Sequence, residues 1–82
     1  MRFTVIWSPD ALSKLADLWN GATDREAISR SAESIERALR DDPGRRGEDL
    51  YGDRLLVEEA LAVAFRVLEG DRIADIFDVW SR

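Results

Sequence analysis

The sequence predicts an α+β domain with an N-terminal strand, a two-helix hairpin and a C-terminal antiparallel sheet. Apolar residues recur at helical spacing as far as Leu39, and from Leu61 onward they alternate with a period of two. The breaker Asp41-Asp42-Pro43-Gly44 separates these two patterns. A chain of 82 residues has the size of a single domain, so we expect residues 1–82 to form one domain.

The first strand and the first helix are expected on either side of Ser8. Residues Phe3–Trp7 are all β-branched or aromatic, which is typical of a strand. Ser8 is a favoured N-cap residue and Pro9 a favoured first helical residue, so a helix is predicted over residues 9–20. Its apolar stripe consists of Leu12, Leu15, Ala16 and Trp19.

A second helix is predicted over residues 23–40. Thr23 and Glu26 match a capping box, with Thr23 as the N-cap. The buried stripe consists of Ile28, Ala32, Ile35 and Leu39. The remaining surface is expected to be solvated and ion-paired, because three Glu–Arg pairs have i, i+4 spacing: Glu26–Arg30, Glu33–Arg37 and Glu36–Arg40. The other interpretation of Arg30 and Arg37, which lie one above the other, is contact with a partner.

The remaining sequence predicts a sheet. Residues 45–53 are expected to form a loop or an irregular edge, and residues 54–57 a short strand. Two longer strands, 61–67 and 72–80, should pair antiparallel around the turn Glu69-Gly70-Asp71. A helical interpretation of the first of these segments suits its composition, but the period of two decides against it.

The two faces of this hairpin differ in character. The core face is predicted to carry Leu61, Val63, Phe65, Val67, Ile73, Phe77 and Val79, with Asp75 as a misfit. The opposite face would then carry Ala62, Ala64, Arg66, Arg72, Ala74, Ile76, Asp78 and Trp80. Three alanines make a shallow floor, and tryptophan is an anchor residue at protein interfaces. We therefore expect a docking area on this face, the alternative being a face that is merely solvated.

The composition excludes several classes of protein. No apolar run approaches the ~18 residues of a membrane span, and the N-terminal apolar run is too short for a signal peptide, so a cytoplasmic protein without a membrane partner is expected. The chain has no cysteine and no histidine, and its acidic residues lack a recognisable ligand spacing, so we expect no metal and no cofactor. The net charge of −5 arises wholly beyond residue 40, because residues 1–40 carry six basic and six acidic side chains. The overall excess of positive charge that is typical of nucleic-acid binding is absent from the sequence.

Five segments of the chain resemble the RelE/ParE superfamily of type II toxins. They are Trp7-Ser8-Pro9-Asp10-Ala11-Leu12, Asp41-Asp42-Pro43, Leu61-Ala62-Val63-Ala64-Phe65-Arg66-Val67, Asp71-Arg72-Ile73 and Asp78-Val79-Trp80-Ser81-Arg82. Each segment is short, but their order and spacing make the resemblance extend over essentially the whole chain. The resemblance implies a toxin of a toxin–antitoxin system, of the kind linked to plasmid stabilisation, with a cognate antitoxin whose C-terminal segment wraps the toxin.

The resemblance implies three alternative activities. RelE-like members are mRNA interferases that cleave mRNA on the ribosome without a metal, and this is the preferred interpretation. ParE-like members instead inhibit DNA gyrase, and the third alternative is a catalytically inactive module that binds an antitoxin. The expected partners are therefore the antitoxin, with the ribosome and mRNA or DNA gyrase as the target.

The resemblance also implies candidate site residues. Arg54 aligns with the basic residue of the first C-terminal strand and Arg82 with a C-terminal arginine, whereas Ala62 stands where an arginine is often found. The full set of candidate catalytic residues is Arg54, Arg66 and Arg82 for phosphate binding and Tyr51 as a proton donor. Because arginine stays protonated, a general base would have to be Glu58, Glu59 or Asp78. The candidate partner-binding residues are Trp80, Ala62, Ala64, Ala74, Arg30 and Arg37.

Overall fold

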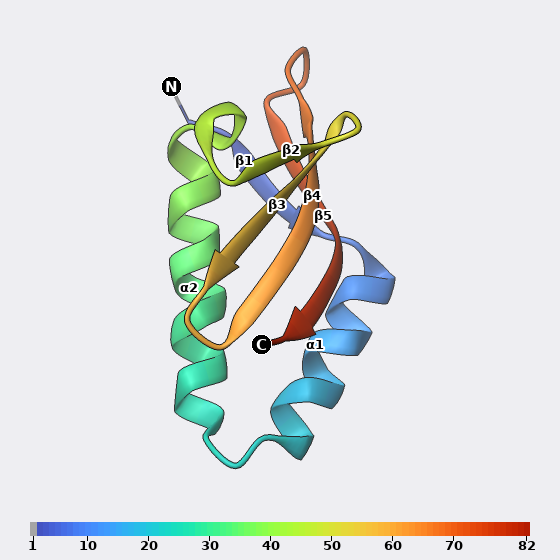
Figure 1. The fold of residues 1–82 in the computed structure, drawn as a ribbon. Coiled ribbons are helices and arrows are strands. Elements are labelled where there is room, and N and C mark those ends of the chain that lie inside the picture. The colour runs from blue at the N-terminus through green and yellow to red at the C-terminus, as the bar shows by residue number, and fades with distance from the viewer. Residues whose placement is uncertain (1) are drawn as a thin grey trace.

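The computed structural model describes residues 2–82, and over these residues two α-helices and a five-stranded sheet follow the predicted order (Figure 1). The elements are β1 (Thr4–Trp7), α1 (Pro9–Gly21), α2 (Arg25–Asp41), the 3₁₀-helix η1 (Pro43–Arg45), β2 (Glu48–Leu50), β3 (Asp53–Glu58), β4 (Leu61–Leu68) and β5 (Ile73–Ser81). The sheet order is β1-β5-β4-β3-β2. β1 is parallel to β5, and the other neighbouring strands are antiparallel. The predicted α+β class is confirmed.

The two helices begin with different capping residues. The Oγ of Ser8 accepts a hydrogen bond from the backbone N–H of Ala11 at 3.1 Å, so the predicted N-cap of α1 is confirmed. The capping box predicted for α2 is wrong, because Asp24 and not Thr23 is the N-cap and accepts from the N–H of Ala27 at 3.1 Å. A carboxylate at this position also interacts favourably with the positive end of the helix dipole.

Both helices pack on one face of the sheet. The buried cluster comprises Ala11 of α1, Ile28, Ile35 and Leu39 of α2, and Leu61, Val63, Phe65, Ala74, Ile76 and Val79 of the sheet. The predicted stripe of α2 is thus largely correct. The predicted stripe of α1 is correct in part: Leu15 packs against the core, but Leu12 and Trp19 are 51% and 39% exposed, and Leu18, which was not predicted, packs there too.

A β-bulge at Phe77 changes the orientation of side chains along β5. Ala64 pairs with Asp78 but the next residue, Phe65, pairs with Ile76, so Phe77 is an extra residue in β5. An extra residue reverses the in–out alternation of the strand on one side of the bulge. Val79 therefore faces the core and Asp78 faces away from it, as predicted, but the faces predicted for residues 73–77 are reversed.

The reversal accounts for each misplaced residue of β5. Ala74 and Ile76 are fully buried in the core, and the parallel strand β1 pairs Val5 and Trp7 with them. Ile73 and Phe77, predicted to face the core, are only partly buried. Asp75, the misfit of the predicted core face, lies on the opposite face, where its cross-strand neighbour is Arg66.

The segment after α2 forms a short edge strand. Tyr51 and Gly52, with φ of +52° and +93°, form the turn between β2 and β3, and positive φ at both central residues is the type I′ pattern of two-residue hairpins. Gly47 precedes β2 with φ +70°, and a Cβ atom there would lie 2.1 Å from the carbonyl oxygen of Leu55. Only glycine therefore lets β2 approach β3. Within residues 2–82, neither α1 nor α2 is long and apolar enough to cross a membrane.

Candidate functional site

The face of the sheet opposite the helices, here called the outer face, is the main candidate site. Figure 1 shows β3, β4 and β5 running in front of the helices, with α2 along one side and α1 along the other. Two cross-strand rows lie on it: Val57, Ala62 and Trp80 make one, which is apolar, and Leu55, Ala64 and Asp78 make the other, which ends in a carboxylate. Side chains opposite one another in an antiparallel pair share a face, so these rows are contiguous.

The predicted alanine floor exists in part. Ala62 pairs with Trp80, and its own side chain is almost fully covered by its neighbours, with 2% of its surface exposed. Ala64 lies beside it in the second row. Ala74 does not belong to this floor, because the bulge at Phe77 turns it into the core, where it is fully buried. The docking area is therefore formed by Val57, Ala62, Ala64 and the half-buried Trp80, without Ala74.

Arg66 is the one candidate catalytic arginine on the outer face among the described residues. Its Nε donates to the carboxylate of Asp53 at 3.0 Å, and its guanidinium lies 4.9 Å from the centre of the Phe77 ring. The hydrogen bond to Asp53, with its charge, raises the pKa of Arg66 above its ordinary value, and Asp75 adds to this effect. The charge of Arg66 is thus already paired within the protein.

The other candidate catalytic residues lie elsewhere. Arg54 shares the helix side of β3 with Leu56, and it donates to the carbonyl oxygens of Arg46 at 2.8 Å and Gly47 at 3.1 Å. Tyr51 is fully exposed at the tip of the β2–β3 turn. The structure does not bring these side chains to one point with Arg66.

Arg82 lies at the far end of the hairpin from Arg66. Its backbone N–H donates to the carbonyl of Ala60 at 3.0 Å, and its guanidinium donates to the carbonyl of Glu59 at 3.0 Å. Leu61 and Arg66 are five residues apart on β4, which at the strand rise of ~3.3 Å per residue corresponds to roughly 16 Å. The two arginines therefore do not share a phosphate-sized site.

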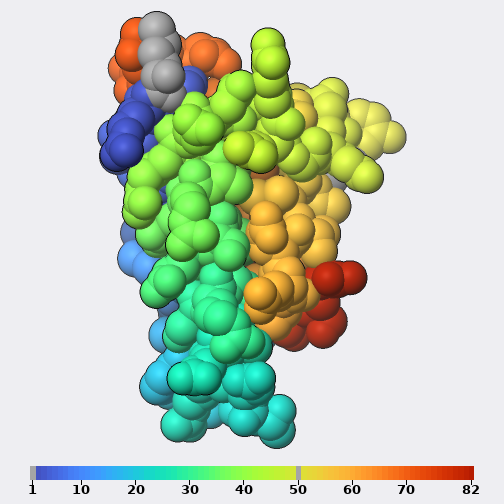
Figure 2. All heavy atoms as spheres, turned by 90° about the vertical axis from the view of Figure 1, so that its left-hand side faces the viewer, coloured from blue at the N-terminus to red at the C-terminus, as the bar shows by residue number. Residues whose placement is uncertain are grey.

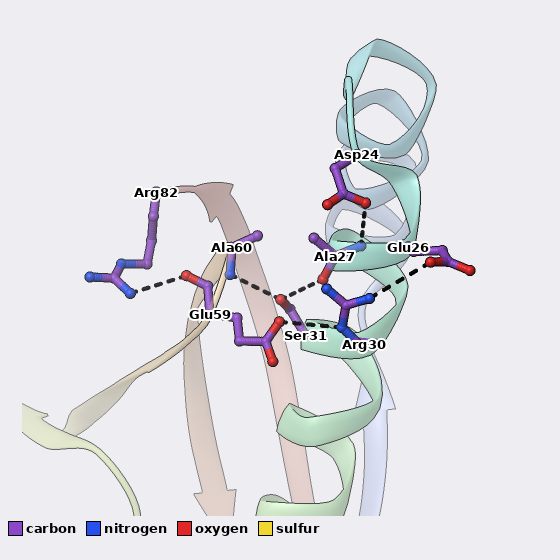
Figure 3. A network of polar contacts seen from close by, with 8 residues as sticks. All are labelled: Asp24, Glu26, Ala27, Arg30, Ser31, Glu59, Ala60 and Arg82. Atoms are coloured by element: carbon purple, nitrogen blue, oxygen red, sulfur yellow. Dashed lines mark hydrogen bonds and ion pairs between the residues drawn. The ribbon is translucent and has the colours of Figure 1, made fainter.

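The turn between β3 and β4 joins two of the predicted residues in a structural role (Figure 3). Glu59, with φ +45°, accepts from Arg82 through its carbonyl, and its carboxylate lies 3.6 Å from the Nε of Arg30. Arg30 also pairs with Glu26 at 3.9 Å. Both arginines thus hold this turn against α2 and the end of β5.

Ser31 is a residue that the sequence interpretation missed. It is fully buried; its hydroxyl donates to the carbonyl of Ala27 at 2.7 Å and accepts from the N–H of Ala60 at 3.0 Å (Figure 3). The available signal was its position three residues after Ile28, because a serine on the buried stripe of a helix requires a hydrogen-bond partner.

The surface of α2 forms two of its three predicted ion pairs. One is the pair of Arg30 with Glu26 described above, and the other is the pair of Arg40 with Glu36 at 3.2 Å. The prediction of a pair between Glu33 and Arg37 is wrong, since Arg37 forms no ion pair with any residue of the described range 2–82. Arg37 is therefore an exposed cation of α2 that has no ion-pair partner in the part of the chain that the structure describes.

Asp78 is tied to α1 and not to a catalytic partner. Its carboxylate accepts from Lys14 at 2.8 Å and from the backbone N–H of Val79 at 2.9 Å. The hydrogen bond from Lys14 lowers the pKa of Asp78, while its partial burial opposes this and the Val79 N–H adds to it. A carboxylate with a lowered pKa is a poor general base. Among residues 2–82, no group of three or more acidic side chains is arranged to hold a metal ion.

A second apolar surface lies between the helices. Its lining includes Leu12, Trp19 and Ile28 around a groove of about 380 Å³. Trp19 is held in place by its indole N–H, which donates to Ser29 at 3.2 Å, and by Arg25, whose guanidinium lies 4.7 Å from the ring centre. This groove is lined by residues of α1 and α2 alone and has no residue in common with the docking area of the outer face.

Comparison with known proteins places the fold. No protein-family model matches the sequence, and no curated protein matches it. Among solved structures, a chain of the toxin–antitoxin complex RelBE2 from Mycobacterium tuberculosis has a TM-score of 0.84 at 19% identity, over 100% of both chains. The chromosomal ParDE toxin–antitoxin system of P. aeruginosa follows with a TM-score of 0.68 at 15% identity, over 98% of this chain and 96% of that one.

The RelBE toxin–antitoxin complex of E. coli has a TM-score of 0.60 at 12% identity, again over 98% of this chain and 96% of that one. The chain thus has the α+β fold of the RelE/ParE toxins, as its motifs predicted. At these identities the similarity is one of fold.

Proposed function

We propose that this chain is the toxin component of a type II toxin–antitoxin pair and that it acts by binding its target, not by cleaving RNA. The first half of the proposal is supported by the fold, because solved structures that share it over nearly their full length are components of RelBE and ParDE complexes. A cognate antitoxin is therefore the expected partner.

The second half is supported by the dispersal of the candidate catalytic residues. Metal-free RNA cleavage requires a base, an acid and a phosphate-binding cation around one scissile bond. Here Arg66 is paired with Asp53, Arg54 holds the loop before β2, and Arg82 holds the β3–β4 turn. A gyrase-binding protein of the ParE kind does not need a base, an acid and a phosphate-binding cation at one point.

The outer face is the surface that we assign to the antitoxin. Ala64 lets a partner approach the sheet closely, and Trp80, which covers Ala62, supplies a large apolar contact at low entropic cost. The carboxylates Asp75 and Asp78 on the same face already have cationic neighbours, so apolar contact should dominate recognition. Binding is therefore expected to weaken only modestly with salt.

Induced expression, with and without any antitoxin-like protein that is found encoded beside this one, tests the function. We expect growth arrest that the neighbour relieves, with accumulation of cleaved DNA complexes and intact mRNA. Arg66→Gln should retain the arrest, because this side chain is not catalytic under the proposal. Fragmented mRNA that disappears in Arg66→Gln would instead establish the ribosome-dependent ribonuclease.

A titration of the purified neighbour protein tests the surface. Trp80→Ala should weaken binding by at least about tenfold, a typical loss for an interface anchor. Tyr51→Ala is the matched control, because Tyr51 is an exposed aromatic residue away from the docking area. Equal affinities of wild type and Trp80→Ala would mean that the antitoxin uses another surface.

A further inference from the structure

The apolar groove between the helices, here called the inter-helix groove, lies on a part of the molecule that projects from the sheet. Its lining comes from α1 and α2 alone. Figure 2 shows only cyan and teal atoms at one end of the molecule, where α1 ends and α2 begins, beyond the orange and red atoms of β4 and β5. Another molecule can therefore approach both helices at this end without meeting the strands.

The inter-helix groove is free of charge. Among the described residues its lining includes no charged side chain, although 35% of the residues of the chain are charged. Depletion of charged residues is typical of the centre of a protein interface. It also bears on the occupant, because two copies that each carry a net charge of −5 repel one another through their charged surfaces. A surface without charge is where a second copy can make contact.

α1 forms one wall of the inter-helix groove and presents an apolar ridge beside it. Leu12 and Trp19, which are 51% and 39% exposed, stand on either side of the exposed Ala16. The indole N–H of Trp19 donates to Ser29, and the guanidinium of Arg25 lies against its ring. Because Trp19 is already fixed, little side-chain entropy is lost when it binds. The surface thus carries both an apolar ridge and an apolar groove.

A two-fold axis beside Ala16 makes this surface complementary to itself. Leu12 and Trp19 lie ~6 Å and ~4.5 Å from Ala16 along the helix axis, in opposite directions. When two α1 helices cross antiparallel at Ala16, Leu12 of each copy lies beside Trp19 of the other. The small side chain of Ala16 lets the two helix axes approach to ~8–10 Å at the crossing point.

We propose that two copies of this chain associate through their helix hairpins, with the ridge of α1 in each copy seated in the inter-helix groove of the other. The four helices then pack as in a helix bundle. This self-association goes beyond the proposed toxin function. It uses no residue of the docking area on the outer face, so a second copy and an antitoxin can bind at the same time.

The size of the contact sets its strength. The 13 residues of α1 make a helix ~20 Å long, and two helices side by side are about 20 Å wide, which gives roughly 400 Å² for each copy. The total of about 800 Å² is below the ~1,200 Å² at which stable interfaces begin. The dimer is therefore weak and reversible, with an expected Kd between about 10 and 500 µM.

Sedimentation equilibrium of the purified protein from about 10 µM to 1 mM covers this range and tests the proposal. Ala16→Glu and Ala16→Lys should each raise the Kd at least about tenfold, because like charges meet at the two-fold axis. An equimolar mixture of the two variants should associate again, since the new carboxylate of one copy then meets the new ammonium of the other. Ala16 is exposed on α1, so both variants are expected to fold, which circular dichroism checks.

Leu68→Glu is the matched control. Leu68 is a large apolar residue of β4 that is 38% exposed and lies outside the inter-helix groove, so its substitution should leave the Kd unchanged. A wild-type protein that is monomeric at 1 mM, equal weakening by Leu68→Glu, or a mixture of the Ala16 variants that stays monomeric would each overturn the proposal. If the wild type is monomeric and Ala16→Glu instead weakens binding of an antitoxin-like neighbour, the groove belongs to a different protein. Growth arrest is measured separately and tests the toxin function alone.

Discussion

Ser31→Ala is expected to destabilise the protein through a single backbone group. The hydroxyl of Ser31 is the acceptor for the N–H of Ala60, and the residue is fully buried. Removing the hydroxyl leaves that N–H without its partner, which costs roughly 1–3 kcal/mol. Alanine is a better helix former than serine and returns about 0.5 kcal/mol. The net loss should therefore be about 0.5–2.5 kcal/mol.

Such a loss is large for a domain of this size. With 82 residues, 1 kcal/mol corresponds to roughly 4–8 °C in Tm. Thermal and urea unfolding followed by circular dichroism measure the change, and hydrogen exchange at the Ala60 amide locates it. The amide should exchange much faster in the variant, because the β3–β4 turn opens locally without the hydroxyl.

Ser34→Ala is the matched control for this experiment. Ser34 lies on the same helix, one turn further along, and gains the same helix propensity without losing a hydrogen bond that the structure records. The difference in unfolding free energy between the two variants isolates the contribution of the Ser31 hydroxyl. A difference below about 0.3 kcal/mol, or unchanged exchange at Ala60, would refute the reasoning.

Three further predictions concern other parts of the fold. Lys14→Met should cost less than about 1 kcal/mol at neutral pH, because the ion pair with Asp78 is exposed. Since Lys14 lowers the folded-state pKa of Asp78, this stabilisation is complete above the unfolded pKa of about 3.9 and is lost as the pH falls through the folded value. Gly47→Ala should lower stability by more than about 2 kcal/mol, measured by urea unfolding, because its φ is positive and a Cβ would meet backbone. Asp24→Ala should cost about 1 kcal/mol and Thr23→Ala almost nothing, because the former is the N-cap of α2.

For each of these three predictions, a specific result would contradict the physical reason given. A stability difference between wild type and Lys14→Met that persists below pH 3 would mean that the lysine acts by packing and not by charge. Gly47→Ala should be compared with Gly21→Ala, where no atom lies within 4 Å of the new Cβ, and equal losses would contradict the steric argument. Equal losses in Asp24→Ala and Thr23→Ala would restore the predicted capping box.

The class of fold was determined by local patterns in the sequence. The strand before Ser8, the helix that begins at Pro9 and the change of period after Pro43 each follow from residue preferences over a few positions. The resemblance to RelE/ParE toxins was carried by similarly short segments, and the solved structures confirm it at the level of fold. Patterns of this kind depend on neighbours in the chain, which the sequence states directly.

The site was decided by the tertiary structure. One extra residue at Phe77 exchanged the faces of Ala74 and Asp75, and no local pattern marks a bulge whose cause lies in the pairing with β4. The partners of the arginines were equally hidden, because Asp53 and Glu59 come from strand ends and turns that meet Arg66 and Arg30 only in the folded protein. Charge pairing depends on distances across the fold, and these are set by strand register and helix packing. The sequence therefore determined which arginines the chain has, and the tertiary structure determined which of them are ion-paired and which, such as Arg37, have no ion-pair partner among residues 2–82.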